Sequence, residues 1–463
     1  MMKLKIIVVL VASLIVVVST GAQSLPNLLP LPDATGFVET YNVNNAPISL
    51  TGAFFQSLGT NGRSCASCHL PTEGWSISAA EVQFRFRLTR GLDPIFRTND
   101  GSVCDQNIDT STVEERREAY RLLLSRGLIR IAIHMPAGAE FTVANVRNPY
   151  GCGSTSTLSM YRRPLPATNL KFLSTLMWDG RESTAPSTEK IVYPDGGELL
   201  RDLAHQAVDA TTGHAQGSEP TPAQVQDIVN FETSLRTAQA IDYFAGRLND
   251  GGASGGPVAL ASQQFFIGIN DSFPDDPFEF NHTDAPFDPN VFNLFSPWKN
   301  ALGRRASIAR GEELFNSKPI TISGVAGIND VAGLPASFSG TCGTCHDTPN
   351  VGNHSVSAPL NIGVADVTSP LDVSYLPVFT LVNNVTGAKV QTTDPGRALI
   401  TGKWADIGKL KGPILRGLAS RAPYFHNGSA STLADVLLFY EKRFNMSFTA
   451  QEKTDLIAFL NAL

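Results

Sequence analysis

Two short stretches of this sequence each bring two thiols and an imidazole into one turn of chain. The CxxCH motif occurs as Cys65, Cys68 and His69, and again as Cys342, Cys345 and His346. Two cysteines at this spacing can bond to the two vinyl groups on one porphyrin edge, and the next residue turns its imidazole toward the iron. Zinc usually needs a second ligand pair nearby, and neither stretch has one. A redox dithiol needs no histidine directly after it. We therefore predict two covalently bound c-type haems.

The chemistry of each haem depends on the ligand at the sixth position of its iron. A strong second ligand favours electron transfer, whereas an open position permits reaction with peroxide. The sequence contains these further histidines: His134, His205, His214, His282, His354 and His426. Taken singly, each is more simply explained as a surface or hydrogen-bonding residue than as a ligand.

Similar elements surround the two motifs. Short helical patterns precede them at 52–58 and 310–316, and an amphipathic helix closes each half of the chain. Thr221 is the expected N-cap of the first closing helix. Thr449 and Glu452 form the expected capping box of the second. This repetition predicts a mainly α fold with two cytochrome c-like haem domains and long loop insertions.

The domain boundaries follow from the same repetition. We predict a signal peptide over 1–24, an N-terminal cytochrome c-like domain over 25–245 and a C-terminal one over 246–463. A glycine-rich stretch, LNDGGASGGP, lies near the boundary and is typical of a linker. Three insertions are predicted as loops: 76–158, 265–302 and 351–396.

The N-terminus has the features of an export signal. Lys3 and Lys5 precede the apolar run 6–18, which is too short for a membrane span of about 20 residues. The alternative is an uncleaved anchor. We predict a periplasmic protein without stable membrane insertion, and the net charge of −6 does not suggest nucleic-acid binding. In such an oxidising compartment, Cys104 and Cys152 are expected to form a structural disulfide.

Three further stretches carry a family resemblance. They are PATNLKFLSTLMWDGRE at 166–182, LAHQAVDATTGHAQG at 203–217, and GPILRGLASRAPYFHNGSASTLADVLLFY at 412–440. With the two motifs, they resemble the bacterial di-haem cytochrome c peroxidases and MauG, the di-haem enzyme that oxidises tryptophans in a partner protein. Their order along the chain agrees with the family, and the insertions match nothing in it.

The resemblance implies roles for several residues. Trp178 matches the tryptophan that relays electrons between the haems, although a buried core tryptophan is the alternative. Tyr440, fourteen residues after His426, matches the position of the second haem's sixth ligand, which is a methionine in the peroxidases and a tyrosine in MauG. Met446 is the rival ligand. Phenolate stabilises ferric or higher iron, whereas a thioether raises the potential.

The peroxide-binding side of the first haem departs from the family pattern. The family has a glutamine and a glutamate there, and here Gln206 takes the first place while Gln216 falls on the second. A glutamine cannot move a proton, but a histidine can. His214 or Glu198 is therefore the candidate acid–base group. His134 is a further candidate as a removable ligand.

The resemblance also implies a calcium ion between the domains, bound through the backbone at Arg421 and Pro423. The leading hypothesis is a periplasmic oxidoreductase that reduces hydrogen peroxide, or forms high-valent iron as MauG does, with electrons passing from the second haem to the first. Its expected partners are a small redox protein or other electron donor, and a second copy in a homodimer. Two alternatives stay open: a non-catalytic electron-transfer cytochrome, and an oxygen-activating oxidase acting on an organic substrate.

Overall fold

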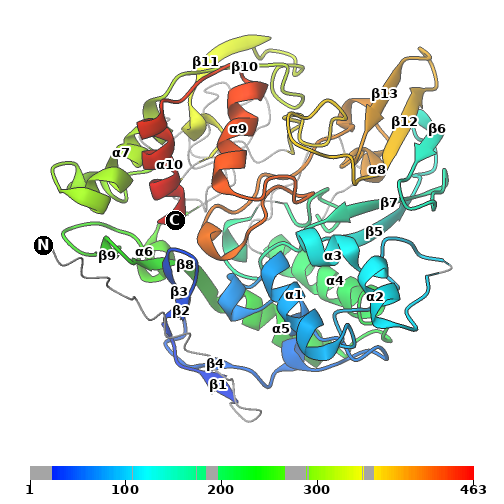
Figure 1. Cartoon of the computed structure of the whole chain (residues 1–463), viewed down its shortest axis with the longest axis horizontal. Coiled ribbons are helices and arrows are strands. Elements are labelled where there is room, and N and C mark those ends of the chain that lie inside the picture. The colour runs from blue at the N-terminus through cyan, green and yellow to red at the C-terminus, as the bar shows by residue number, and fades with distance from the viewer. Residues whose placement is uncertain are drawn as a thin grey trace, which may run out of the picture.

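The computed structural model describes residues 23–106, 108–173, 175–183, 197–265, 288, 291–346, 348 and 359–463. Figure 1 shows helices α7, α9 and α10 gathered in one region and helices α1 to α5 in another, with small sheets between and around them. The predicted signal peptide lies almost wholly outside the described residues, and none of the described helices is long and apolar enough to cross a membrane.

Helices and strands are both abundant in this fold, which is mixed α/β. Of the residues that the structure describes, 32% are in helices and 19% in strands, so the prediction of a mainly α fold is wrong. The error lies in the insertions, because 76–158 contains three helices and two complete strands, and 351–396 contains a strand pair. The stretches IRIAIH, FTVANVR and VFTLVN in them are rich in β-branched residues, which favour strands.

The helices have the following bounds: α1 Ala79–Thr89, α2 Val113–Ala119, α3 Arg121–Arg126, α4 Gly197–Gly213, α5 Pro222–Ser234, α6 Pro257–Ser262, α7 Gly303–Ser317, α8 Ala398–Thr401, α9 Leu433–Arg443 and α10 Ala450–Asn461. The strands have the following bounds: β1 Ser24–Leu25, β2 Leu31–Pro32, β3 Gly36–Asn42, β4 Ile48–Ser49, β5 Ile129–His134, β6 Phe141–Arg147, β7 Thr157–Arg162, β8 Leu235–Asp242, β9 Gly246–Arg247, β10 Ile320–Ser323, β11 Ser337–Gly340, β12 Val378–Asn383 and β13 Lys389–Thr392.

Pairing between strands joins distant parts of the chain. One sheet has the order β2-β3-β8-β9 and a second has the order β13-β12-β6, while β5 pairs with β7, β10 with β11 and β1 with β4. Strand β6 pairs antiparallel with β12, from Val378 opposite Arg147 to Asn383 opposite Phe141. The insertions of the two halves of the chain therefore share one sheet.

Both closing helices begin as predicted. Helix α5 follows the N-cap Thr221, whose hydroxyl accepts from the Gln224 backbone at 3.3 Å. Helix α10 follows the capping box of Thr449 and Glu452, with bonds of 3.2 and 2.7 Å. Helix α10 packs closely on α7, because a Cβ on Gly311 would clash with the carbonyl of Asp455. These helices bury phenylalanines next to the second CxxCH motif.

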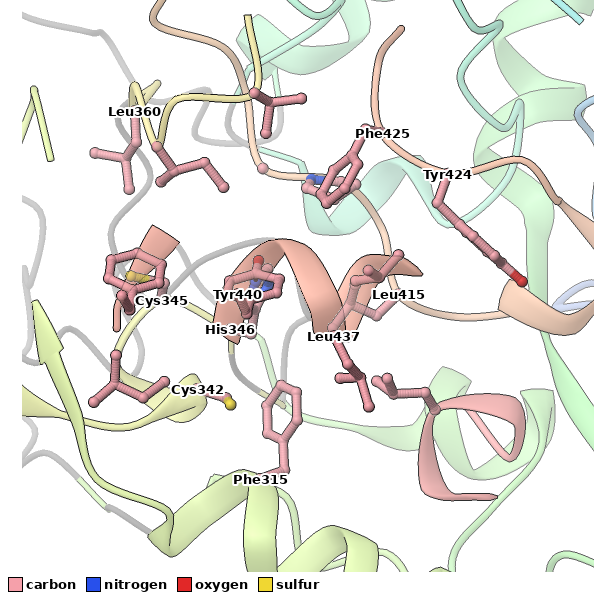
Figure 2. Close-up of a pocket in the computed structure, with 18 of the residues that line it drawn as sticks. Phe315, Cys342, Cys345, His346, Leu360, Leu415, Tyr424, Phe425, Leu437 and Tyr440 are labelled. Carbon is pink, nitrogen blue, oxygen red and sulfur yellow. Dashed lines mark hydrogen bonds between the residues drawn. The ribbon is translucent and has the colours of Figure 1, made fainter. Parts of the chain in front are cut away.

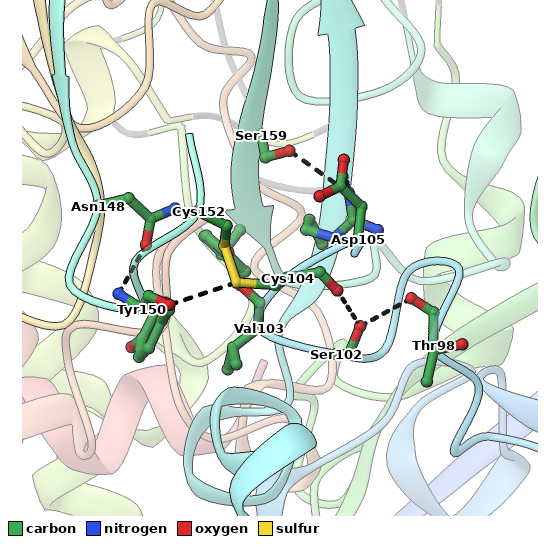
Figure 3. Close-up of a disulfide and its surroundings, with 11 residues drawn as sticks. Thr98, Ser102, Val103, Cys104, Asp105, Asn148, Tyr150, Cys152 and Ser159 are labelled. Atoms are coloured by element: carbon green, nitrogen blue, oxygen red, sulfur yellow. Dashed lines mark hydrogen bonds and ion pairs between the residues drawn. A yellow bond between two sulfur atoms is a disulfide. The ribbon is translucent and has the colours of Figure 1, made fainter. Parts of the chain in front are cut away.

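The predicted disulfide between Cys104 and Cys152 is confirmed, with the two Cα atoms 5.9 Å apart (Figure 3). It closes a loop of the first insertion across a sequence separation of 48 residues. The Tyr161 hydroxyl donates to the Val103 carbonyl beside it at 2.5 Å, so the crosslink is tied to strand β7.

Candidate functional site

Each CxxCH motif lies on the wall of its own cavity. The first cavity is lined by Cys65, Cys68 and His69, and the second by Cys342, Cys345 and His346. All four of these cysteines are free thiols. Figure 2 shows both thiols and the imidazole of the second motif directed at one interior space.

Local hydrogen bonds explain why each motif folds into a single turn. In the first, Ser64 and Ser67 bond to each other's backbone, and the His69 amide donates to the Cys65 carbonyl at 3.1 Å. In the second, Thr341 and Thr344 form the same box. The paired cysteines therefore face the same side of the turn, as attachment to one porphyrin edge requires.

The first motif's imidazole is oriented for metal binding. Its Nδ1 lies 2.9 Å from the carbonyl oxygen of Trp75, which holds Nδ1 as the donor and leaves Nε2 free to bind iron. Burial lowers the pKa of His69, so the ring is neutral at neutral pH. A neutral imidazole with one nitrogen bonded to a carbonyl is the usual state of a metal-ligating histidine.

The cysteines fit thioether bonds to a porphyrin better than they fit zinc. A structural zinc site gathers about four nitrogen, sulfur or oxygen ligands around one ion. Among the described residues, the grouped metal-binding side chains are Glu182, His205 and Asp209, which include no cysteine. The residues of both cavities therefore fit covalently attached haem.

The first cavity has a polar side built around His214. His214 Nδ1 lies 2.5 Å from Asp100 Oδ2, and Arg63 Nη1 lies 2.5 Å from Asp100 Oδ1. Burial alone would raise the pKa of Asp100, but His214 and Arg63 hold it below its usual value. His214 and His69 line the same cavity and are close enough to interact electrostatically. With Nδ1 bonded to a carboxylate, the remaining ring nitrogen of His214 is available for proton transfer or ligation.

Asp100 and Arg63 did not emerge from sequence reasoning. Arg63 lies two residues before the first motif, and Asp100 lies in the first insertion within no recognisable motif. A buried Arg–Asp–His chain across sequence separations above 30 residues leaves no periodic signal.

The other candidate residues lie in different parts of the structure. Gln206 on α4 lines the cavity. Glu198 lies in the first turn of α4, and its side chain is outside the described part of the chain. His134 bonds to the Thr157 hydroxyl at 2.8 Å at the end of β5 and lines neither cavity. His205 lies 2.6 Å from Glu182. His282 and His354 are outside the described residues.

Glu232 is an acidic residue of the first cavity that sequence reasoning missed. It lies on the buried side of α5, four residues after Ile228, and lines the cavity near Cys65. Within the part of the chain that the structure describes, its Oε2 has no hydrogen-bond partner. Burial raises the pKa of Glu232 to about 8, so the carboxyl is mostly protonated at pH 7. A glutamate on the apolar stripe of a closing helix was the available signal.

The second cavity is almost wholly apolar, and a tyrosine faces its imidazole. The hydroxyl of Tyr440, on α9, lies 3.4 Å from His346 Nε2 (Figure 2). Met446, the rival ligand, lines the same cavity. Burial raises the pKa of Tyr440, so forming its phenolate requires a nearby positive charge such as a metal ion. The geometry favours Tyr440 over Met446 as the group opposite His346.

Trp178 lines both cavities. Its indole Nε1 donates to the Arg163 carbonyl at 2.8 Å, and its ring centroid is 6.1 Å from that of His426. The next residue, Asp179, is completely buried and is held by Arg162, which also binds Asp394 at 2.7 Å. This buried ion-pair network anchors the WDGR segment between the cavities.

The predicted calcium position lies close to buried arginine side chains. The carbonyl of Arg421 accepts a hydrogen bond of 3.1 Å from the guanidinium of Arg163. The buried side chain of Arg421 itself donates to backbone carbonyls at Gly417 and Ile414. The Arg163 cation on the Arg421 carbonyl disfavours a calcium ion at that oxygen, and the calcium ion stays a prediction.

Parts of the chain are similar in sequence to known cytochrome-c peroxidases. No protein-family model matches the chain. Cytochrome-c peroxidase IdrP1 of Denitromonas iodatirespirans is 29% identical and the match covers 28% of this chain and 38% of that protein. The same organism's cytochrome-c peroxidase IdrP2 is 32% identical over 27% of this chain and 36% of that protein. These relatives confirm the resemblance to cytochrome c peroxidases.

The extent of the similarity is limited. IdrP1 of Pseudomonas sp. (strain SCT) is 37% identical, but the match covers 15% of this chain and 21% of that protein. The matches to these relatives span at most 38% of the relatives' own length. A solved structure described as a MauG-like protein associated with microbial copper homeostasis aligns over 95% of this chain and 94% of its own, with 16% identity and a TM-score of 0.35.

Proposed function

We propose that this protein is an exported di-haem c-type oxidoreductase that reduces hydrogen peroxide at the first cavity. The observation that carries the proposal is the Asp100–His214 pair on the polar side of the cavity that His69 lines. The similarity to cytochrome-c peroxidases supports it. Bound haem would supply one-electron redox chemistry at iron, held by Cys65, Cys68 and His69.

His214 performs the proton transfer in this proposal. Reduction of peroxide to two waters consumes two protons and two electrons, and it is faster when one group takes a proton from one oxygen and returns it to the other. Asp100 keeps a proton on His214 Nδ1, so the other ring nitrogen is the one that exchanges protons with the substrate. Arg63 holds Asp100 in place and keeps it ionised.

Electrons reach the first cavity from the second. His346 and Tyr440 would hold the second haem, and Trp178 lines both cavities. An aromatic ring between two redox centres splits one long transfer into two shorter ones. Tyr440 supports the MauG-like variant of this function, in which a partner protein is oxidised, because a phenolate favours the ferric state.

A second function has a specific observation in its favour. His214 shares a cavity with His69, so its free nitrogen could ligate the iron instead of binding substrate. Two strong ligands at each iron would make the protein an electron-transfer cytochrome without peroxide chemistry.

EPR of the fully ferric holoprotein, before and after one-electron reduction, separates the two functions. If the protein is a peroxidase, the first haem should give a high-spin EPR signal, or its signal should change on reduction as a ligand is released. Added peroxide should then oxidise a donor. Two low-spin irons in both states, with no peroxide consumption by any donor, would establish the electron-transfer function instead.

A further inference from the structure

A lysine lies on the wall that the two cavities share. Lys411 follows Leu410 in the segment that leads to the resemblance stretch 412–440, and it lines both the first and the second cavity. Its backbone amide donates to the Trp178 carbonyl at 2.8 Å, which fixes it beside the tryptophan. Its side chain is within the protein, with an exposed fraction of 3%.

The ammonium of Lys411 has no partner among the described residues. Its Nζ is fully buried without a hydrogen bond, and no acidic side chain offsets its charge. Burial lowers the pKa of Lys411 to about 7. A buried unpaired ammonium is strongly destabilising, so a cation kept in such a place indicates an anion that completes the site.

The other cations of the cavities are already paired. Each arginine that lines the first cavity has an acidic or carbonyl partner, and these arginines are Arg63, Arg162, Arg163 and Arg181. Among the described residues that line the second cavity, Lys411 is the sole lysine or arginine. Any anionic group that enters the second cavity therefore meets one cationic side chain, and that side chain also reaches the first cavity.

The propionate carboxylates of a haem are suitable anions for Lys411. A c-type haem is attached through its vinyl edge, and its propionate carboxylates lie on the opposite edge. The cysteines line one cavity each, whereas Lys411 lies on the boundary between them. An ammonium has three donors, which is enough to bond carboxylates on both sides.

We propose that Lys411 is a shared positioning residue that binds a propionate of each haem and holds both reduction potentials up. A positive charge in a low-dielectric site favours the ferrous state over the more positive ferric state. This inference rests on the proposal that both cavities bind haem.

The test is redox potentiometry of the holoprotein with three substitutions at one position. In Lys411→Met and Lys411→Gln, both potentials should fall, with at least a tenfold shift in each ferric/ferrous equilibrium, which is about 59 mV for a one-electron couple. Lys411→Arg keeps the charge and should leave both potentials close to wild type. The glutamine variant can still hydrogen-bond a carboxylate, so it keeps the test available if the methionine variant loses its fold.

Lys409→Met is the matched control. Lys409 lies in the same segment, but its ammonium is paired with Asp406 at 3.2 Å, and it lines neither cavity. This variant should leave both potentials unchanged.

The outcomes separate this inference from the proposed function. A haem content of two per chain, by pyridine haemochrome assay, together with unchanged potentials in Lys411→Gln, would overturn the role of Lys411 alone. A fall confined to one haem would overturn the sharing. If the wild-type protein does not contain two haems per chain, the proposed function itself is wrong.

Discussion

The two cavities share a CxxCH turn on the wall but differ in their other lining residues. Each is lined by a CxxCH turn, but the first contains His214, Asp100 and Glu232, whereas the second faces its imidazole with Tyr440 among apolar side chains. Groups that move protons gather in one cavity, and a group that stabilises oxidised iron lies in the other. The difference assigns substrate chemistry to the first cavity and electron storage to the second, within the function proposed above.

The largest effect is expected from substitutions that prevent haem attachment in one cavity at a time. Cys65→Ser with Cys68→Ser should eliminate covalent haem from the first cavity, and the same pair of changes at Cys342 and Cys345 should eliminate it from the second. Haem staining and intact mass would each show one haem fewer. Cys104→Ser with Cys152→Ser is the control, because this disulfide lines neither cavity and its loss should leave two haems.

The next effect tests proton transfer in the first cavity. His214→Ala should lower peroxide turnover by about 10²–10⁴-fold, which is the usual contribution of a general acid–base. Asp100→Asn should lower it less, because it disturbs the orientation of His214 but keeps the imidazole. Steady-state kinetics with a reduced donor measures both.

The control for this test is His134→Ala, since His134 bonds to Thr157 away from both cavities and should turn over peroxide normally. Full activity in the His214 variant would show that this residue does not transfer the proton. It would also contradict the assignment of proton transfer to the first cavity.

A smaller effect concerns the group opposite His346. Tyr440→Phe removes the hydroxyl that lies 3.4 Å from His346 Nε2 and should raise the potential of the second haem on the order of 100 mV. Redox titration followed in the Soret band checks it. Met446→Leu should change the potential little. The reverse pattern, with the methionine variant shifted and the tyrosine variant not, would identify Met446 as the ligand.

The smallest effect is on stability and follows from the buried carboxyl of Glu232. Its pKa is about 8 when folded and about 4.3 when unfolded, so the folded state binds more protons between these values. The free energy of unfolding should therefore fall as pH rises through this window, by up to about 1.4 kcal/mol per pH unit from this group.

Glu232→Gln should lose this dependence, which denaturant unfolding of the holoprotein at pH 5 and pH 8 would measure. Glu118→Gln is the control, because that side chain is 70% exposed. An unchanged pH dependence in the Glu232 variant would mean that the carboxyl is not kept neutral in the first cavity.

The sequence predicted features that depend on neighbouring residues, but it did not predict strand pairing between distant segments. The caps at Thr221 and Thr449 and the Cys104–Cys152 disulfide are confirmed, because capping depends on residues three apart and a lone cysteine pair has one partner choice. The loop prediction for 76–158 and 351–396 is wrong, because strands such as β6 and β12 are stable only when paired with each other across the chain. Most of the third insertion, 265–302, lies outside the described residues.

The sequence by itself determined the two CxxCH turns, the helices that close each half, and the resemblance to the di-haem peroxidases. All of these depend on residue spacing within a few turns of chain. Only the tertiary structure decided that Asp100 orients His214, that burial raises the pKa of Glu232, and that Lys411 lies between the cavities. The reason is physical: proton affinity and charge pairing depend on burial and on neighbours from distant segments, and these exist only once the chain is packed.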